Sequence, residues 1–283
     1  MRRKFIHHFF RLATGLCAAA ACAVLGLIVW AIVKRGWPAI NWRFFTEQIL
    51  LVGADGGIFY NLLGTGILLV TAFCVSAPVA LSLALLHGVY LPPKRRGTLA
   101  LLLYILNGVP SILFGIFGMI VFVQFLGWGK SWLTGGILLG FMILPTVTIA
   151  LMERISAIPR KFGEAAAALG LRESQIIRAV ILPQSVGGLV TGSLLGLARA
   201  AGETAPIMFT ATIFAGATMP SGIKESPVLS LPYHIFILAQ DSFDPAVGSK
   251  LWGTALTLLM LVFLLSLAAL PARLKLKQPA HHD

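Results

Sequence analysis

The chain has 283 residues, of which 58% are hydrophobic and only 11% are charged, and its mean hydropathy is +0.89. A water-soluble domain of this length needs far more charge to cover its surface, so the composition excludes a soluble enzyme or binding module. The net charge of +12 does not indicate a nucleic-acid partner, because the basic residues gather at the ends of apolar segments. The composition indicates an integral membrane protein.

Six apolar segments are long enough to cross a bilayer, since a spanning helix needs roughly 20 mainly apolar residues. The sequence therefore predicts an all-α integral membrane protein with six transmembrane helices. All three cysteines fall inside these segments, so no disulfide framework is expected. The predicted segments lie at about 12–33, 58–86, 98–125, 133–152, 185–212 and 251–272.

Lysine and arginine residues are distributed unevenly between the two sides of the predicted membrane. Fifteen of them lie at the termini or in alternate connections, against six in the remaining connections. Because cytoplasmic connections carry the excess of these residues, both termini and the loop 153–184 are predicted to be cytoplasmic. The larger group is Arg2, Arg3, Lys4, Arg11, Lys94, Arg95, Arg96, Arg154, Arg160, Lys161, Arg172, Arg178, Arg273, Lys275 and Lys277.

The first segment begins with basic residues, as a signal peptide does, but it is long and ends at Lys34 without a small-residue cleavage pattern. We interpret it as a retained helix. The outward connection that follows contains Trp37, Trp42, Phe44 and Phe45, which are typical of the membrane–water boundary. Its simplest interpretation is a surface segment that anchors the chain. The predicted division is an N-terminal helix with its outward connection (1–57), a membrane domain (58–273) and a cytoplasmic tail (274–283).

Three prolines, Pro78, Pro110 and Pro145, lie inside or at the ends of apolar segments. A proline removes a backbone donor and bends or breaks a helix. In a membrane such breaks persist only beside protein or a water-filled cavity. The three prolines therefore favour a transport pathway over a simple anchor.

Glycines recur at four-residue intervals in two of the predicted helices. Small residues at this spacing form a stripe along which two helices approach closely. The partner helix is either in the same chain or in a second membrane subunit, and the sequence does not distinguish the two. The stripes are Gly136 and Gly140 in the fourth segment and Gly188, Gly192 and Gly196 in the fifth.

The cytoplasmic loop 153–184 contains a helix-favouring stretch from Glu164 to Leu169. Pro159 suits the start of this helix, and Gly170 suits the left-handed residue that ends it. A second helix is predicted from about Arg172 to Leu182. The alanine-rich stretch leaves the backbone accessible, so the groove of a partner protein can approach closely. The alternative is a helical hairpin without a partner.

Two charged residues, Arg199 and Glu203, lie in the fifth predicted segment. A charge near the bilayer centre costs on the order of 3 kcal/mol, so it usually faces a cavity or pairs with another charge. Residues four apart on a helix reach each other, and one interpretation is an ion pair with a structural role. The other is an anion site, because the planar donors of Arg199 suit phosphate oxygens.

These motifs resemble those of known transport proteins. The loop resembles the Glu-Ala-Ala loop of bacterial ABC-importer permeases, with the glycine and the Leu-Pro at the family's spacing. A wider part of 55–212 resembles phosphate-importer permeases of the PstA type. The first match consists of Glu164-Ala165-Ala166, Gly170 and Val180-Ile181-Leu182-Pro183, and the second of Gly56-Gly57, Gly64-Thr65, Asn107-Gly-Val-Pro-Ser111 and Arg199 to Pro206.

The resemblance implies a type I ABC importer permease fold in a bacterial inner membrane. It implies three partners: a cytoplasmic ABC ATPase that uses ATP, a second homologous permease subunit and an extracytoplasmic phosphate-binding protein. The chain itself is expected to bind no cofactor and no metal and to have no catalytic residue. The ATPase contact is expected at Glu164, Ala165, Ala166 and Gly170, and the phosphate pathway at Arg199, Glu203 and Thr204.

Two alternatives remain open from the sequence. The nearer one is a permease for a related oxyanion, such as phosphonate, sulfate or molybdate. The more distant one is an intramembrane enzyme that uses Glu203 with His87 or His234. The enzyme interpretation has no second convergent catalytic group at a recognisable spacing.

Overall fold

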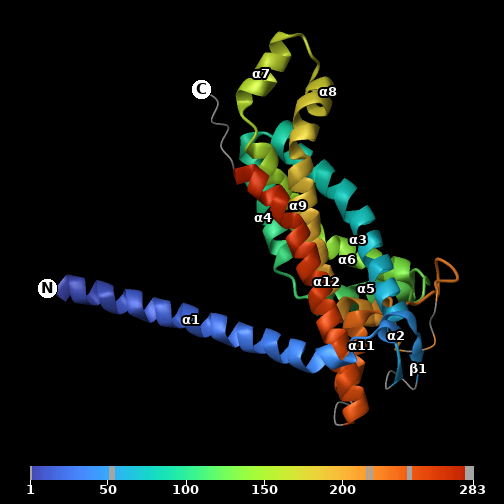
Figure 1. Ribbon diagram of the computed structural model, residues 1–283. Coiled ribbons are helices and arrows are strands. Elements are labelled where there is room, and N and C mark those ends of the chain that lie inside the picture. The colour runs from blue at the N-terminus through green and yellow to red at the C-terminus, as the bar shows by residue number, and fades with distance from the viewer. Residues whose placement is uncertain (1, 51–54, 215, 217–218, 241–243, 278–283) are drawn as a thin grey trace.

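The computed structural model describes residues 2–50, 55–214, 216, 219–240 and 244–277. Within these ranges the chain is mostly helical, with one two-stranded antiparallel ribbon formed by β1 (Ile49–Leu50) and β2 (Asp55–Gly56). Long helices run side by side in one bundle, and a short hairpin projects from one end (Figure 1). The remaining elements are α1 (Arg2–Gly36), η1 (Trp37–Ala39), α2 (Trp42–Thr46), α3 (Phe59–Leu85), η3 (Leu86–Tyr90), α4 (Pro93–Asn107), α5 (Ser111–Gly118), η4 (Met119–Phe125), α6 (Trp132–Ser156), α7 (Arg160–Ala168), α8 (Glu173–Ile176), η5 (Ile177–Ile181), α9 (Leu182–Ala201), α10 (Ala205–Thr210), α11 (Leu231–Gln240) and α12 (Pro245–Lys277).

Among the described residues, five continuous helices are long and apolar enough to cross a membrane, and a bent pair of helices makes a sixth span when the two are counted together. The apolar segment predicted at 98–125 is bent, as expected from Pro110, because α4 and α5 meet at an angle of 86°. Pro110 explains the break: it has no N–H donor, and it disfavours helical geometry at Val109. The five continuous spans are Phe9–Ala39, Phe59–Tyr90, Trp132–Ser156, Glu173–Ala201 and Val247–Pro271.

The fifth predicted segment, 185–212, is also interrupted. Helix α9 ends at Ala201, Gly202 caps it, and the separate helix α10 follows. The helix predicted from about Arg172 to Leu182 is present as α8 and the π-helical turn η5, and it continues without interruption into α9. The wider hydrogen-bond spacing of a π-turn accommodates Pro183, which lacks a backbone donor.

Pro78 and Pro145 lie inside the continuous helices α3 and α6. Neither interrupts its span. Of the three prolines, only Pro110 therefore breaks a spanning helix.

Helix α6 lies between α3 and α9, and glycines set both contacts. A Cβ atom added at Gly136 would lie 2.5 Å from Cβ of Thr71 in α3, and one added at Gly192 would lie 2.8 Å from Cβ of Ala150 in α6. Both glycine stripes are thus filled by packing within the chain. The core between these helices includes Ile143, Val147 and Leu151, all fully buried.

Helix α1 projects from the bundle and joins it near α12 (Figure 1). None of its most apolar window is buried in the chain, as expected for a helix surrounded by lipid or by another subunit. At its end the Arg35 guanidinium lies 5.0 Å from the centroid of the Trp252 ring. Helix α12 extends to Lys277, into the predicted tail, and the rest of that tail lies outside the described residues.

Candidate functional site

The two breaks in the spanning helices meet at one polar cluster. Asn107 is the last residue of α4, immediately before the bend, and Arg199 lies in the last turn of α9. Thr146 comes from α6, the residue after Pro145. Three spans that are distant in sequence therefore supply one polar side chain each to the same place.

Asn107 joins the other two side chains. Nη1 of Arg199 donates a hydrogen bond to Oδ1 of Asn107 at 3.0 Å. The hydroxyl of Thr146 donates to the same oxygen at 3.4 Å. Because both donors point at one acceptor, the Asn107 amide orients the guanidinium of Arg199 relative to α6.

Arg199 also reaches Glu203, as predicted, with 3.6 Å between Nε and Oε1. The two residues do not share one continuous helix, because α9 ends between them at Ala201. The Arg199 side chain is 38% exposed and that of Glu203 is 18% exposed in the isolated chain. Thr204 follows directly, is half-buried, and its carbonyl accepts a hydrogen bond from Met208 N–H at 3.0 Å.

This arrangement leaves Arg199 able to bind an anion. A guanidinium carries five N–H donors, and within the described part of the chain the contacts to Asn107 and Glu203 involve only Nε and Nη1. The position in the last turn of α9 also favours a cation, because a helix C-terminus carries partial negative charge. The partly open guanidinium can therefore donate hydrogen bonds to oxyanion oxygens without leaving its partners.

Helices α5 and α10, which follow the two breaks, pack on each other and hold the cluster together. A Cβ atom added at Gly115 would lie 2.9 Å from the carbonyl oxygen of Ala205, and one added at Gly118 would lie 3.0 Å from Cγ2 of Thr210. Only glycine permits this approach. The two short helices that follow the breaks are therefore in close contact.

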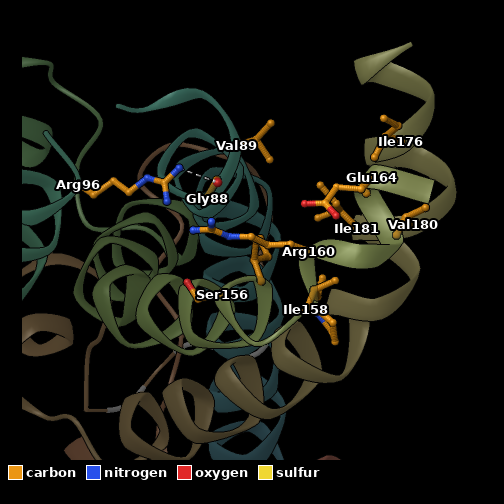
Figure 2. Close-up of a pocket in the computed structure, with 13 residues that line it drawn as sticks. Gly88, Val89, Arg96, Ser156, Ile158, Arg160, Glu164, Ile176, Val180 and Ile181 are labelled. Carbon is orange, nitrogen blue, oxygen red and sulfur yellow. Dashed lines mark hydrogen bonds between the residues drawn. The ribbon is translucent and has the colours of Figure 1, made fainter. Parts of the chain in front are cut away.

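The projecting hairpin is the second candidate site. Helix α7 ends in a Schellman motif, in which Gly170 N–H donates to Ala167 and Leu171 N–H donates to the Ala166 carbonyl. Gly170 has φ +78°, which confirms it as the left-handed stop. Glu164 lies on the inner side of α7, facing the cavity between the hairpin and the bundle (Figure 2).

The predicted contact residues of the hairpin differ in exposure. Glu164, Ala165 and Gly170 are exposed, whereas Ala166 is 6% exposed and lies against the chain's own structure. Leu169 is 82% exposed at the tip, a position that the sequence reasoning did not single out.

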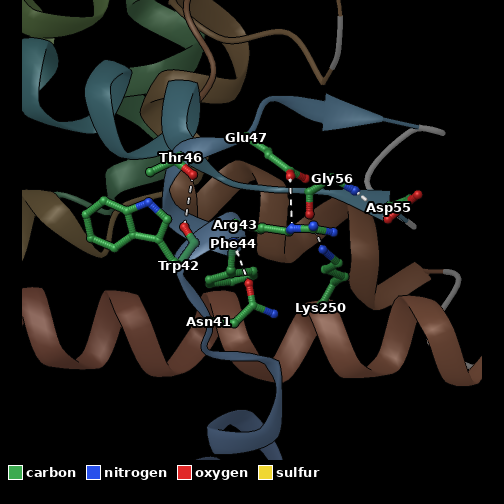
Figure 3. Close-up of polar contacts among 9 residues, drawn as sticks. All are labelled: Asn41, Trp42, Arg43, Phe44, Thr46, Glu47, Asp55, Gly56 and Lys250. Atoms are coloured by element: carbon green, nitrogen blue, oxygen red, sulfur yellow. Dashed lines mark hydrogen bonds and ion pairs between the residues drawn. The ribbon is translucent and has the colours of Figure 1, made fainter.

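The connection between α1 and α3 packs against α3 and α12. Phe44 is 1% exposed, so the interpretation of this aromatic residue as a surface anchor is wrong. Figure 3 shows the arrangement: Asn41 Oδ1 accepts the Phe44 N–H at 2.8 Å, and Lys250 of α12 donates to the Gly56 carbonyl. Lys250 Nζ also lies 5.5 Å from the Phe44 ring centroid. Trp42 remains exposed.

The residues required by the enzyme alternative are not brought together. His87 belongs to η3 and His234 to α11, and no hydrogen bond or ion pair among the described residues joins either to Glu203. The pKa of His234 is lowered to about 4, first by burial and then by the charge of Lys250. His234 is therefore neutral and enclosed at neutral pH.

The family model for the inner membrane component of binding-protein-dependent transport systems matches residues 76–275. The chain belongs to this family. Among solved structures, an inward-facing form of the MetNI methionine ABC transporter superposes on the permease with a TM-score of 0.56 at 19% identity. The superposition covers 77% of this chain and 93% of that one. The predicted type I ABC importer permease fold is thus confirmed, and the chain is a multi-pass inner membrane protein.

Individual relatives resemble the permease over nearly its full length. A phosphate transport system permease protein, PstA 2 of Mycobacterium bovis, is 30% identical and covers 94% of this chain and 86% of its own. PstA of Xylella fastidiosa strain Temecula1 is 30% identical, covering 98% and 96%. A probable ABC transporter permease protein of Bacillus subtilis, YqgI, is 26% identical, covering 95% of each chain. The predicted resemblance to PstA-type permeases is confirmed.

Proposed function

We propose that this chain is the permease subunit of an ATP-driven importer that moves inorganic phosphate inward across the bacterial inner membrane. Two independent lines support the cargo. Relatives at 30% identity over almost the whole chain carry the name of phosphate permeases. The polar cluster also places a partly open guanidinium between the two broken spans.

The observation that carries the proposal is the placement of Arg199. Its donors suit the oxygens of a tetrahedral oxyanion, and Asn107 and Glu203 restrain it from two sides. A transport site must bind its ion strongly enough to load it and weakly enough to release it. Glu203 weakens the attraction of Arg199 for an anion, so the pair provides a moderate site along the path, with Thr204 as a further donor.

Glu203 also offers a chemical basis for choosing phosphate over sulfate. At neutral pH inorganic phosphate keeps at least one proton, whereas sulfate keeps none. A carboxylate oxygen accepts a hydrogen bond from the phosphate hydroxyl, but it faces only acceptor oxygens in sulfate. An unpaired acceptor at short range disfavours binding. Glu203 is therefore expected to select the protonated oxyanion.

Cargo competition tests this proposal. The assembled importer, reconstituted in vesicles with its binding protein, is expected to take up radiolabelled phosphate when ATP is supplied to the ATPase. Excess unlabelled sulfate, molybdate or phosphonate should leave that uptake unchanged. Uptake of labelled sulfate at a comparable rate, with no uptake of phosphate, would overturn the phosphate assignment and support the related-oxyanion alternative.

The hairpin formed by α7 and α8 is proposed to couple the permease to a cytoplasmic ABC ATPase, with both termini on the same side. Its support is the projection of the hairpin from the bundle (Figure 1), the exposed Glu164 and Ala165, and the apolar tip at Leu169. Helix α8 continues directly into α9. A displacement of the hairpin is therefore transmitted along one continuous helix to Arg199. A second permease subunit and the phosphate-binding protein complete the proposed assembly.

Copurification tests the coupling proposal. Leu169→Asp places a charge on a side chain that contacts little of this chain, so the permease should fold normally and lose its ATPase. The matched control is Leu50→Asp, which alters an exposed leucine of the outward connection and should retain the ATPase. Full retention of the ATPase by Leu169→Asp, with normal ATP-driven uptake, would contradict docking at the hairpin tip.

A further inference from the structure

A cavity of about 540 Å³ lies where the hairpin joins the bundle. It is bounded by η3 and the start of α4 on one side, by the end of α6 below, and by α7 and η5 on the other. Arg96 and Arg160 form the basic part of its wall, Ser156 and Glu164 also line it, and most of the remaining wall is apolar. The apolar wall consists of Val89, Ile155, Ile158, Ile176, Val180 and Ile181.

Both arginines line this one cavity, although they come from different elements, α4 and α7. Figure 2 shows the two side chains, with the Arg96 guanidinium bonded to the Gly88 carbonyl. Arg96 is fixed by hydrogen bonds from Nη2 to Gly88 O at 3.1 Å and from Nε to Leu91 O at 2.9 Å. Within the described part of the chain, Arg160 has no hydrogen bond and no ion pair.

Two like charges that line one cavity repel each other, and an anion between them relieves that repulsion. Glu164 lies on the opposite side of the cavity (Figure 2), and no ion pair joins it to either arginine among the described residues. A phosphate group bridges two guanidinium groups well, because each offers paired donors to its oxygens. The basic part of the cavity therefore fits a phosphate group.

The apolar wall decides what kind of phosphate compound fits. A free inorganic ion gains nothing from six branched aliphatic side chains, whereas the acyl chain of a lipid does. The cavity is also on the side of the bundle where the basic residues are concentrated, and basic pockets between spanning helices at the cytoplasmic surface suit acidic headgroups. We propose that this cavity binds an anionic phospholipid of the cytoplasmic leaflet, with its phosphate between Arg96 and Arg160.

The position gives the lipid a defined role. Arg96 belongs to α4, whose other end is Asn107, and Arg160 is the first residue of α7. A bridging phosphate ties the hairpin to the helix that holds Asn107. An anionic lipid therefore restrains the hairpin relative to the bundle.

Lipid retention tests the proposal. The full-length chain is purified in detergent with the subunits that copurify, titrated with dioleoylphosphatidylglycerol, and the bound lipid is counted by native mass spectrometry. Dioleoylphosphatidylcholine and inorganic phosphate serve as competing probes. Arg160→Gln is the informative variant because it breaks no contact within the described chain. Arg95→Gln is the matched control: it removes the same charge from the start of α4 but does not line the cavity.

Phosphatidylglycerol should be retained by the wild type and by Arg95→Gln, and bound roughly tenfold more weakly by Arg160→Gln, which loses one charge-assisted contact. Phosphatidylcholine should not compete. Equal retention by the two variants, or equal binding of phosphatidylcholine, would overturn the proposal. Displacement of the lipid by inorganic phosphate would identify a free-anion site instead. Loss of the ATPase from Arg160→Gln with unchanged lipid retention would show that the arginines pair with that subunit, which also contradicts a lipid site.

Discussion

Gly192 sets the distance between α6 and α9, and its replacement by alanine is expected to disturb both stability and transport. The added Cβ atom would lie 2.8 Å from Cβ of Ala150 and 3.2 Å from Cα of Val147. Carbon atoms normally approach to about 3.5–4.0 Å, so the helices must separate by roughly 0.7 Å. Overpacking of this kind costs about 1–3 kcal/mol, partly offset by the better helix propensity of alanine, about 0.5–1 kcal/mol.

The functional effect follows from the position of Gly192 in α9. Arg199 lies two helical turns further on, about 10 Å along the same axis. Separation of α9 from α6 therefore moves the guanidinium away from the side of α6 that carries Thr146. We expect Gly192→Ala to lower the midpoint of thermal unfolding of the purified complex and to reduce phosphate uptake at an unchanged amount of protein.

Gly97→Ala provides the matched control, because it introduces the same substitution in α4 with no atom within 4 Å of the new Cβ. This variant should be more stable than the wild type by about 0.5–1 kcal/mol. The two substitutions are thus expected to have opposite signs. Wild-type stability and uptake in Gly192→Ala, or an equal loss in Gly97→Ala, would refute the conclusion that the α6–α9 contact positions Arg199.

Three further predictions concern other parts of the chain. Asn107→Ala removes the acceptor that orients Arg199, so half-maximal uptake should require about tenfold more phosphate-loaded binding protein, and an unchanged requirement would contradict the orienting role. The pKa of His234 is lowered from 6.5 to about 4 by burial and then by Lys250; the unfolded chain therefore binds more protons between these values. Stability should thus fall as the pH drops from 6.5 toward 4, by up to about 3 kcal/mol, and His234→Gln should flatten thermal-unfolding midpoints over that range. Gly170→Ala forces a side chain into the left-handed conformation (φ +78°), which costs about 1 kcal/mol; limited proteolysis should cut the hairpin faster, and an unchanged cleavage rate would contradict strain at the cap.

The elements of the fold were largely predictable because local patterns determine them. Length and hydropathy located all six apolar segments, and the Pro-Gly boundaries of α7 were placed to within a residue. The Arg199–Glu203 pairing was predicted from a four-residue spacing. The glycine stripes were recognised, but their partners depend on which helices lie side by side, and the spacing contains no information on that.

The sequence predicted Arg199 and Glu203 at the candidate site, but it did not predict their contact with Asn107 and Thr146. Asn107 and Arg199 are 92 residues apart, and Thr146 lies between them at a separation of 39 residues from Asn107. No local pattern relates residues over these distances. One local signal is available: a polar side chain that lies three residues before a helix-breaking proline in an apolar segment. Polar side chains and unpaired backbone groups are stable in a membrane only where they contact protein or water. In this chain that signal points to Asn107.

The most direct test of the central claim is the uptake of phosphate by the Arg199→Gln variant in vesicles that contain the assembled importer. Glutamine keeps a polar side chain but removes the charge and the paired donors. The control, Arg43→Gln, removes the arginine of a second Arg–Glu pair, Arg43–Glu47, which is exposed and lies outside the cluster. Uptake should be abolished in Arg199→Gln and normal in Arg43→Gln, with the complex assembled in both. Near-normal uptake by Arg199→Gln would assign Arg199 to structure and contradict its place in the phosphate pathway.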